Sequence, residues 1–245
     1  MNDKITLLKT ISIIVVFTIF FSLKEKQSRI LVFSKTLSYR HASIEVGKKC
    51  IRELGLKNGF RADTTENCND FNDKNLKKYD AVVFLNTSGD VLDEVQQESF
   101  KRFIKSGKGF IGIHGASDTE YDWPWYGKLV GAYFTNHPLD PNVRKGVYQV
   151  VDKIHPACKH LPERWEREDE FYNFKDINPS IKVLLNIDEK SYEGGKNGEN
   201  HPMSWCHEYD GGRSFYTNLG HTEASYSDPL YKDHLLGGIK YVLQK

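Results

Sequence analysis

From residue 29 onward, short runs of apolar residues alternate with segments whose apolar residues recur at helical spacing. The predicted strands of this first half span residues 29–34, 60–65, 80–89 and 109–118. Helices are predicted over 43–54, ending at Gly55, and over 91–107. Strands that alternate with helices and consist of continuous apolar runs indicate βαβ units and a parallel sheet covered on both faces.

The second half is less regular. Residues 119–179 mix aromatic, proline and charged residues, and we expect a long functional insertion there rather than a packed unit. The predicted elements after it are strands at 181–187, 201–209 and 213–220 and a last helix at 229–243. No internal repeat or linker interrupts the pattern, so residues 29–245 are predicted to form one domain.

The N-terminus carries the one long apolar run of the chain. Lys4 and Lys9 precede an uncharged stretch at 10–23. As a helix it would rise about 21 Å, which is short of the roughly 30 Å of a bilayer core. Residues 1–24 are therefore predicted to be a signal peptide, with an uncleaved anchor as the alternative. We expect a periplasmic or extracellular protein, associated with a membrane only if this segment is retained.

Composition excludes some classes of partner and site. The chain has 34 Lys+Arg against 33 Asp+Glu, a balance that excludes a basic nucleic-acid binder and suits an uncharged ligand. None of the four cysteines shows C-x-x-C spacing, so a zinc-thiolate site is not expected. Export would permit disulfides in any of three full pairings, but buried free thiols are the favoured interpretation. The oligomeric state stays open.

Polar residues that follow the predicted strands are the candidates for chemistry. In open parallel sheets ligands bind at the carboxyl ends of the strands. The residues at those ends are Arg40, His41, His114, Asp118, His221 and Glu223. Imidazoles and carboxylates suit proton transfer near neutral pH. They also suit a divalent metal, although no H-x-x-x-H or H-E-x-x-H motif is present.

The fourth strand ends in a turn that resembles a nucleophile elbow. Such an elbow needs small neighbours because its central residue sits on a strained strand-to-helix turn. Here His114 is central, between Gly112 and Ala116. No Ser or Cys occupies that position, so a covalent acyl-enzyme is not expected.

Aromatic residues gather in the predicted insertion. Trp123, Trp125 and Tyr126 precede His137, and aromatic side chains beside a polar site commonly stack on sugar rings. The alternative is that they only pack the insertion onto the sheet. Glu170 lies in an acidic and aromatic stretch at 168–172 and is predicted to face the same pocket.

Several motifs in order resemble the ThuA-like, or trehalose utilisation, family. They are SYRH (38–41), GFIGIHGASDT (109–119), YDWPWYGKLVGAYF (121–134), HPACKHLP (155–162), DEFYNF (169–174), HPMSW (201–205) and GGRSFYTNLGHT (211–222). The resemblance implies the class I glutamine amidotransferase-like fold, a flavodoxin-like three-layer α/β sandwich with a mainly parallel sheet. It also implies a link to the catabolism of trehalose and related disaccharides through 3-keto sugars.

The same resemblance assigns roles to individual residues. His221 and Glu223 match the base and orienting acid of the amidotransferases, whereas His114 stands where their cysteine nucleophile lies. We therefore expect an enzyme that acts on a disaccharide or 3-keto-glycoside by lyase, isomerase or hydrolase chemistry. His41 and His114 would polarise the carbonyl or hold a divalent metal. Asp118 and Glu170 would be acids, and Arg40, Trp123, Trp125, Tyr126 and His137 would bind the sugar. The alternative is a non-catalytic carbohydrate-binding protein.

Overall fold

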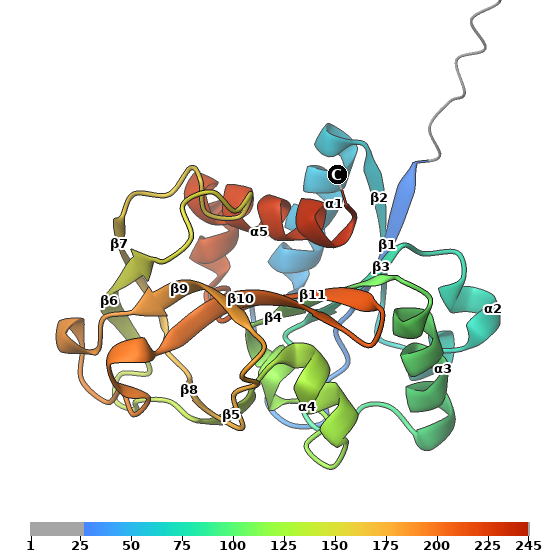
Figure 1. The fold of residues 1–245 in the computed structure, drawn as a ribbon, viewed down its shortest axis with the longest axis horizontal. Helices are drawn as coiled ribbons and strands as arrows, with labels where there is room; N and C mark the ends of the chain where they lie inside the picture. The colour runs from blue at the N-terminus through green and yellow to red at the C-terminus, as the bar shows by residue number, and fades with distance from the viewer. Residues whose placement is uncertain (1–26, 245) are drawn as a thin grey trace, which may run out of the picture.

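Nine strands form one sheet in the computed structural model, which describes residues 27–244 (Figure 1). The predicted signal or anchor segment at residues 1–24 lies outside the described residues. The strand order is β2-β1-β3-β4-β11-β10-β9-β6-β7. None of the helices within 27–244 has the length and apolar character needed to cross a bilayer.

The centre of the sheet is parallel. Its strands are β2 (Phe60–Thr65), β1 (Ser28–Phe33), β3 (Ala81–Leu85), β4 (Gly109–Ile113) and β11 (Gly212–Thr217). Every residue of β3 and β4 is buried, because both faces of these strands are covered. The predicted parallel sheet is therefore confirmed for this part of the molecule.

Helices cover both faces of the parallel part. α1 (Ile44–Asn58) and α5 (Pro229–Val242) lie on one face, and α3 (Glu94–Lys105) and α4 (Pro124–Val130) lie on the other (Figure 1). The short α2 (Asp73–Leu76) packs beside α3. This arrangement is the predicted three-layer sandwich.

The predicted end of the first helix at Gly55 is wrong. α1 continues to Asn58, and Gly59 ends it with a left-handed φ of 74°. At Gly55 a Cβ atom would lie 2.7 Å from the carbonyl oxygen of Phe60. Glycine is thus used there for the close approach of β2 and not to stop the helix.

Residues 119–179 are more regular than the sequence indicates. Besides α4 they form β5 (Tyr133–Asn136), β6 (Val143–Val150), β7 (Arg164–Glu170) and β8 (Asn173–Lys175). β6 and β7 join β9 (Lys182–Ile187) and β10 (Pro202–Tyr209) as an antiparallel extension of the main sheet, while β5 and β8 pair separately. The expectation of an unpacked insertion is therefore wrong: this region completes the sheet.

The antiparallel extension curls back toward the centre. β7 is the edge strand, separated from β11 by β10, β9 and β6. Nevertheless the Asp169 carboxylate in β7 accepts hydrogen bonds from the backbone N–H groups of Gly220 and His221, which follow β11, at 3.1 and 3.2 Å. Sheet twist of this kind accumulates over many strands. It brings the end of β7 to the carboxyl ends of the parallel strands.

The four cysteines are free thiols. Cys50, Cys158 and Cys206 are buried, and Cys68 is partly exposed. Burial raises the pKa of the Cys50 thiol to about 11 and that of Cys158 to about 12. The interpretation as buried free thiols is confirmed for three of the four.

Candidate functional site

Four side chains from four parts of the fold meet where the strands end. His41 follows β1, His114 comes directly after β4, Glu170 is the last residue of β7, and His221 follows β11. One donor atom from each lies within 4.8 Å of the others. We call these four residues the His/Glu cluster. His41, His114 and Glu170 are buried and His221 is partly buried, so their chemistry takes place largely out of water.

The elbow at the end of β4 positions His114. This residue has a φ of 47°, a left-handed conformation that non-glycine residues rarely adopt. A Cβ atom on Gly115 would lie 2.8 Å from the carbonyl oxygen of Thr87, so the turn needs a glycine there. The His114 ring bonds through Nδ1 to the carbonyl oxygen of Asn218. That bond places the proton on Nδ1 and leaves Nε2 facing the cluster.

Glu170 connects the histidines. Its Oε2 lies 3.2 Å from Nε2 of His114 and 3.1 Å from Nδ1 of His221. Its Oε1 accepts a hydrogen bond of 2.7 Å from Nδ2 of Asn142 and lies 3.4 Å from Nε2 of His137. Glu170 therefore occupies the position of an orienting acid for His221.

Asp169 holds the backbone that carries His221. Its side chain has no exposed surface, and it accepts from the N–H groups of Gly220 and His221 and from the Ser225 hydroxyl. Arg167 lies 3.3 Å from the same carboxylate. The turn after β11 is thus tied to the end of β7, which fixes where the His221 ring can lie.

The electrostatics of the cluster follow from its burial. Burial, reinforced by the neighbouring His114 and His221, lowers the pKa of His41 to about 2, so its imidazole is neutral. Burial acts to raise the pKa of Glu170, but the interactions of its carboxylate with the His114 and His221 rings outweigh burial and lower that pKa below its ordinary value. Glu170 is therefore an anion among imidazoles.

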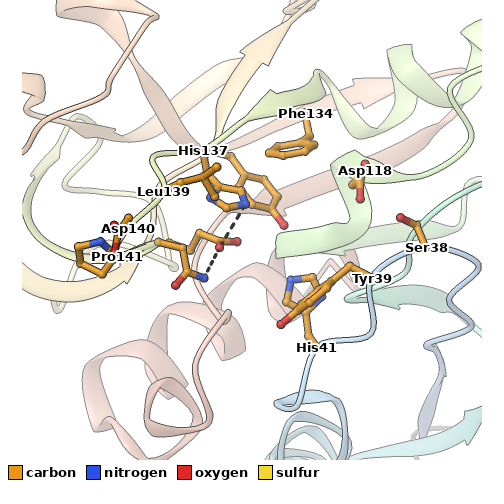
Figure 2. Close-up of a pocket in the computed structure, with 12 residues that line it drawn as sticks. Ser38, Tyr39, His41, Asp118, Phe134, His137, Leu139, Asp140 and Pro141 are labelled. Atoms are coloured by element: carbon orange, nitrogen blue, oxygen red, sulfur yellow. Dashed lines mark hydrogen bonds and ion pairs between the residues drawn. The ribbon is translucent and has the colours of Figure 1, made fainter.

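Two residues of the His/Glu cluster, His41 and Glu170, line a pocket of about 590 Å³, whereas His114 and His221 lie behind them and do not line it (Figure 2). Ser38 and Tyr39 lie on one side, and His137, Leu139, Asp140 and Pro141 lie on the other (Figure 2); Asn142 also lines the pocket. The remaining lining residues are Asp118, Phe134 and Tyr172. None of these lining residues is Lys or Arg. The pocket offers aromatic walls and carboxylates but no cationic side chain for an anionic ligand.

Asp118 and His137 also lie where the sequence predicts them, in the wall of the pocket. Asp118 Oδ1 accepts a hydrogen bond of 2.8 Å from the Tyr121 hydroxyl. Burial raises the pKa of Asp118 above its ordinary value. This favours a carboxyl that can hold and release a proton nearer neutral pH.

Two charged residues predicted for the site lie outside the pocket. Glu223 is exposed at the start of a short 3₁₀ helix (Glu223–Ser227), and within residues 27–244 no hydrogen bond or ion pair joins it to His221. The assignment of Glu223 as orienting acid is therefore wrong, and Glu170 takes that place. Arg40 is half exposed and pairs with both carboxylate oxygens of Glu66 at 2.9 Å. It does not line the pocket.

The predicted sugar-stacking aromatic residues also lie elsewhere. Tyr126 is fully buried against Phe84, and its hydroxyl donates to the carbonyl oxygen of Ala116. Trp123 and Trp125 stack on each other with ring centroids 4.9 Å apart and pack against the core. These three residues attach α4 to the sheet, as the alternative interpretation holds, and the stacking role assigned to them is wrong.

The aromatic residues that do line the pocket are Tyr39, Phe134 and Tyr172. Phe134 and Tyr172 lie in the aromatic and acidic stretches that the sequence singles out, but the sequence reasoning did not choose them as site residues, and it missed Tyr39 and the anchoring roles of Asn142 and Asp169. Tyr39 lies beside His41 in the loop after β1, a strand-end position that could have drawn attention to it. The other four depend on how the antiparallel extension returns to the site, for which the sequence carries no local signal.

The family follows from comparison of this sequence with known families. Residues 29–242 match the ThuA family, described as trehalose utilisation. The chain belongs to the trehalose utilisation family. This membership supports a function related to carbohydrates. No curated protein matches the sequence.

Solved structures similar to this ThuA chain support the fold. A ThuA-like protein from Bacteroides uniformis has 22% sequence identity and a TM-score of 0.73, with 88% of this chain and 91% of that chain covered. A ThuA-like protein from Parabacteroides merdae has 20% identity and a TM-score of 0.70, with 89% and 90% covered. A β-galactosidase from Bacillus circulans has 13% identity and a TM-score of 0.55, with 89% of this chain but 30% of that chain covered. At these identities the likeness concerns the fold.

Proposed function

We propose that this ThuA-family protein is an enzyme of disaccharide and 3-keto-glycoside catabolism that removes a proton next to the ketone and cleaves the glycosidic bond by elimination. The observation that supports this most directly is the His/Glu cluster, two members of which, His41 and Glu170, line the pocket. It supplies imidazoles and a carboxylate at a strand end where the fold has no Ser or Cys nucleophile. Proton transfer is the chemistry that such a set performs without a covalent intermediate.

The proton to be removed is on carbon 2 of the sugar. A ketone at carbon 3 acidifies the neighbouring C–H bond. Glu170 accepts from Nδ1 of His221, so the lone pair on Nε2 of His221, which lies 3.4 Å from Nδ2 of Asn142 in the structure, takes the carbon 2 proton once the sugar is bound. The electron pair of that C–H bond forms the enolate, whose oxygen His41 polarises through its otherwise unpartnered Nδ1.

The bond that breaks joins carbon 1 to the glycosidic oxygen. The enolate electrons re-form the ketone, a double bond forms between carbons 1 and 2, and the oxygen leaves with the aglycone. Asp118, whose pKa is raised by burial, is the group that donates a proton to this oxygen. Addition of water to the double bond would complete a net hydrolysis.

The lining of the pocket favours an uncharged sugar. Its volume of about 590 Å³ lies within the range of small-molecule sites. Tyr39, Phe134 and Tyr172 present aromatic surface for the apolar faces of sugar rings. Since no Lys or Arg lines the pocket, a phosphorylated sugar would lose its hydration without gaining a cationic partner.

A turnover screen tests this function. We expect the wild type to release the aglycone from 3-keto-glucose glycosides, including 3-keto-trehalose, and His221→Ala to lose turnover while it still binds the sugar. Glu223→Gln is the matched control, because it lies outside the pocket. Binding of sugars with no turnover of any keto-sugar or disaccharide, with or without divalent metal, would instead indicate the carbohydrate-binding protein.

We also propose that the protein is exported by its N-terminal segment. The uncharged run at residues 10–23 after Lys4 and Lys9 supports this. N-terminal sequencing of the protein recovered outside the cytoplasm should find a chain that starts near residue 24. A full-length chain in the membrane fraction would indicate the anchor, and a full-length chain in the cytoplasm would contradict export.

A further inference from the structure

We propose that the His/Glu cluster is a binding site for one divalent transition-metal ion, with zinc as the ion it fits best. The ligands are Nε2 of His114, Nδ1 of His221 and Oε2 of Glu170, with His41 as the fourth. This goes beyond the proposed function, since proton abstraction needs no metal. The claim rests on four features of the cluster.

The first feature is the spacing of the three central donor atoms. His114 Nε2 lies 3.2 Å from Glu170 Oε2, His221 Nδ1 lies 3.1 Å from the same oxygen, and the two ring nitrogens are 3.2 Å apart. Ligands bound tetrahedrally to zinc at about 2.05 Å are separated from one another by about 3.3 Å. The three atoms thus form one face of a tetrahedron of nearly the size that zinc requires.

The second feature is an unpartnered nitrogen beside that face. His41 is buried and its Nδ1 has no hydrogen-bond partner among the residues described. Buried polar atoms almost always have a partner, so such an exception calls for an explanation. A ring nitrogen of His41 lies within 4.8 Å of the other three donors, so a metal ion among the four would be bound by this buried imidazole.

The third feature is the outer contacts that orient the ligands. Nδ1 of His114 bonds to the Asn218 carbonyl oxygen, which fixes the tautomer with a free lone pair on Nε2. Oε1 of Glu170 accepts from Asn142, and Asp169 holds the backbone of His221. Metal-binding histidines and carboxylates are typically held by such second contacts. The ligands are therefore in place before an ion arrives.

The fourth feature is the chemistry of the donor set, which selects the ion. Three imidazoles and one carboxylate suit zinc and other first-row transition ions. Magnesium and calcium prefer sites built from oxygen ligands. No cysteine belongs to the cluster, which disfavours copper(I). His41 and Glu170 also line the pocket, so a bound ion would lie at its base, within reach of an incoming sugar oxygen.

Metal binding would change the roles of His221, His41 and Asp118 in the proposed mechanism, and this consequence rests on the proposed function. With Nδ1 of His221 on a metal, its Nε2 carries a hydrogen and cannot accept the carbon 2 proton. Asp118 is the pocket carboxylate outside the cluster and would then be the proton acceptor. The metal would supply a Lewis acid for the ketone oxygen.

The test measures metal binding in the absence of sugar. The full chain, prepared without a histidine tag, is stripped with a chelator and titrated with zinc by calorimetry, and its metal content is measured by mass spectrometry before stripping. We expect about one zinc ion per chain, since one set of four ligands is present. Cobalt(II) substituted at the same site should give the intense visible absorption of a tetrahedral centre.

Variants identify the ligands. Glu170→Gln and His221→Ala should each weaken zinc binding by more than about 100-fold, because each removes a ligand and not merely an outer contact. Glu189→Gln is the matched control: Glu189 also contacts a buried histidine, His201, at 2.8 Å, but lies outside the cluster. Circular dichroism confirms that each variant is folded. The wild-type titration decides whether the protein binds zinc, and the folded variants decide whether zinc binds at this cluster.

Two results would overturn the metal site. One is a wild type that binds no zinc, manganese or cobalt at micromolar concentrations. The other is zinc binding that is unchanged in Glu170→Gln and His221→Ala. Failure of the proposed function looks different: zinc binds but no keto-sugar reacts. Turnover by the metal-free protein at the wild-type rate would retain the proposed function and contradict a metal in it.

Discussion

Replacement of Asp169 by asparagine should destabilise the fold and disturb the site together. The buried carboxylate accepts from five donors: the N–H groups of Glu170, Gly220 and His221 at 3.0, 3.1 and 3.2 Å, the Ser225 hydroxyl at 3.1 Å, and Nη2 of Arg167 at 3.3 Å. Asparagine keeps the size of the side chain, but it turns one acceptor oxygen into an NH₂ donor. At least two of the five donor groups would then face the NH₂ group of asparagine, which cannot accept their hydrogen bonds.

The expected loss follows from these contacts. Breaking one side of a buried ion pair costs about 3–5 kcal/mol, and Arg167 would retain Asp228 at 3.1 Å, which places the loss near the lower value. We therefore expect Asp169→Asn to lose about 3 kcal/mol of unfolding free energy. For a chain of this size that corresponds to a fall in Tm of about 6–12 °C.

Urea unfolding and a keto-glucoside assay measure the two effects. Glu168→Gln is the matched control, since Glu168 is an exposed carboxylate one residue away in β7 and should change stability by less than about 0.5 kcal/mol. Asp169→Asn should also lower kcat/KM at least about 10-fold at temperatures where the variant is folded, because the backbone that positions His221 is released. A loss below about 1 kcal/mol, or an equal loss in Glu168→Gln, would refute the reasoning.

Four further outcomes are expected. Glu170→Gln should lower kcat/KM for a keto-glucoside at least about 100-fold, because it removes the anion that contacts both imidazoles. Tyr39→Ala should raise KM about fivefold in the same assay with kcat little changed, since its ring is a wall of the pocket and not a reacting group. Ion pairing with Arg40 lowers the pKa of Glu66 from 4.5 to about 2. The stability that Glu66 contributes is therefore present above pH 4.5 and is lost as the pH falls toward 2. In thermal unfolding across this pH range, the Tm values of the wild type and of Glu66→Gln should converge at the acid end. A thiol reagent should modify Cys68 first in the native protein and all four cysteines after denaturation, as mass mapping of the labelled sites would establish.

The parallel half of the fold could be predicted from the sequence because its strands are buried on both faces. β3 and β4 are continuous apolar runs, and such runs stand out against the helical periodicity of α1 and α3. The capping box of Asp93 and Gln96 starts α3 at Glu94, three residues after the predicted start at residue 91. Each of these signals lies within one segment of the sequence, so the element can be predicted without knowing which strand or helix it packs against.

The antiparallel extension could not be predicted in the same way. β7 has the sequence RWEREDE, in which exposed and buried positions mix and six of seven residues are charged. It is an edge strand, and charged residues at an edge are a common protection against further pairing. Its identity as a strand depends on pairing with β6, which the local pattern of residues does not reveal.

The candidate site likewise has a part that the sequence predicts and a part that it does not. His41, His114 and His221 follow parallel strands, whose carboxyl ends meet at one edge, and the sequence predicts their convergence. The contact of Glu170 with His221 depends on how far the sheet curls, which is a property of the whole sheet. Glu223 was assigned from its place after His221, but Thr222 caps the following 3₁₀ helix and the chain turns Glu223 toward solvent.

The most direct test of proton abstraction by the His/Glu cluster is hydrogen exchange at carbon 2 of a 3-keto-glucoside, followed by proton NMR in D₂O. The wild type should replace the carbon 2 hydrogen by deuterium in the sugar or its product, and Glu170→Gln should do so at least about 100-fold more slowly. Exchange is detected whether the sugar is then cleaved or only isomerised. Retention of the carbon 2 hydrogen by a sugar that is bound, or equal exchange by Glu170→Gln, would contradict the assignment of this cluster as the reacting centre.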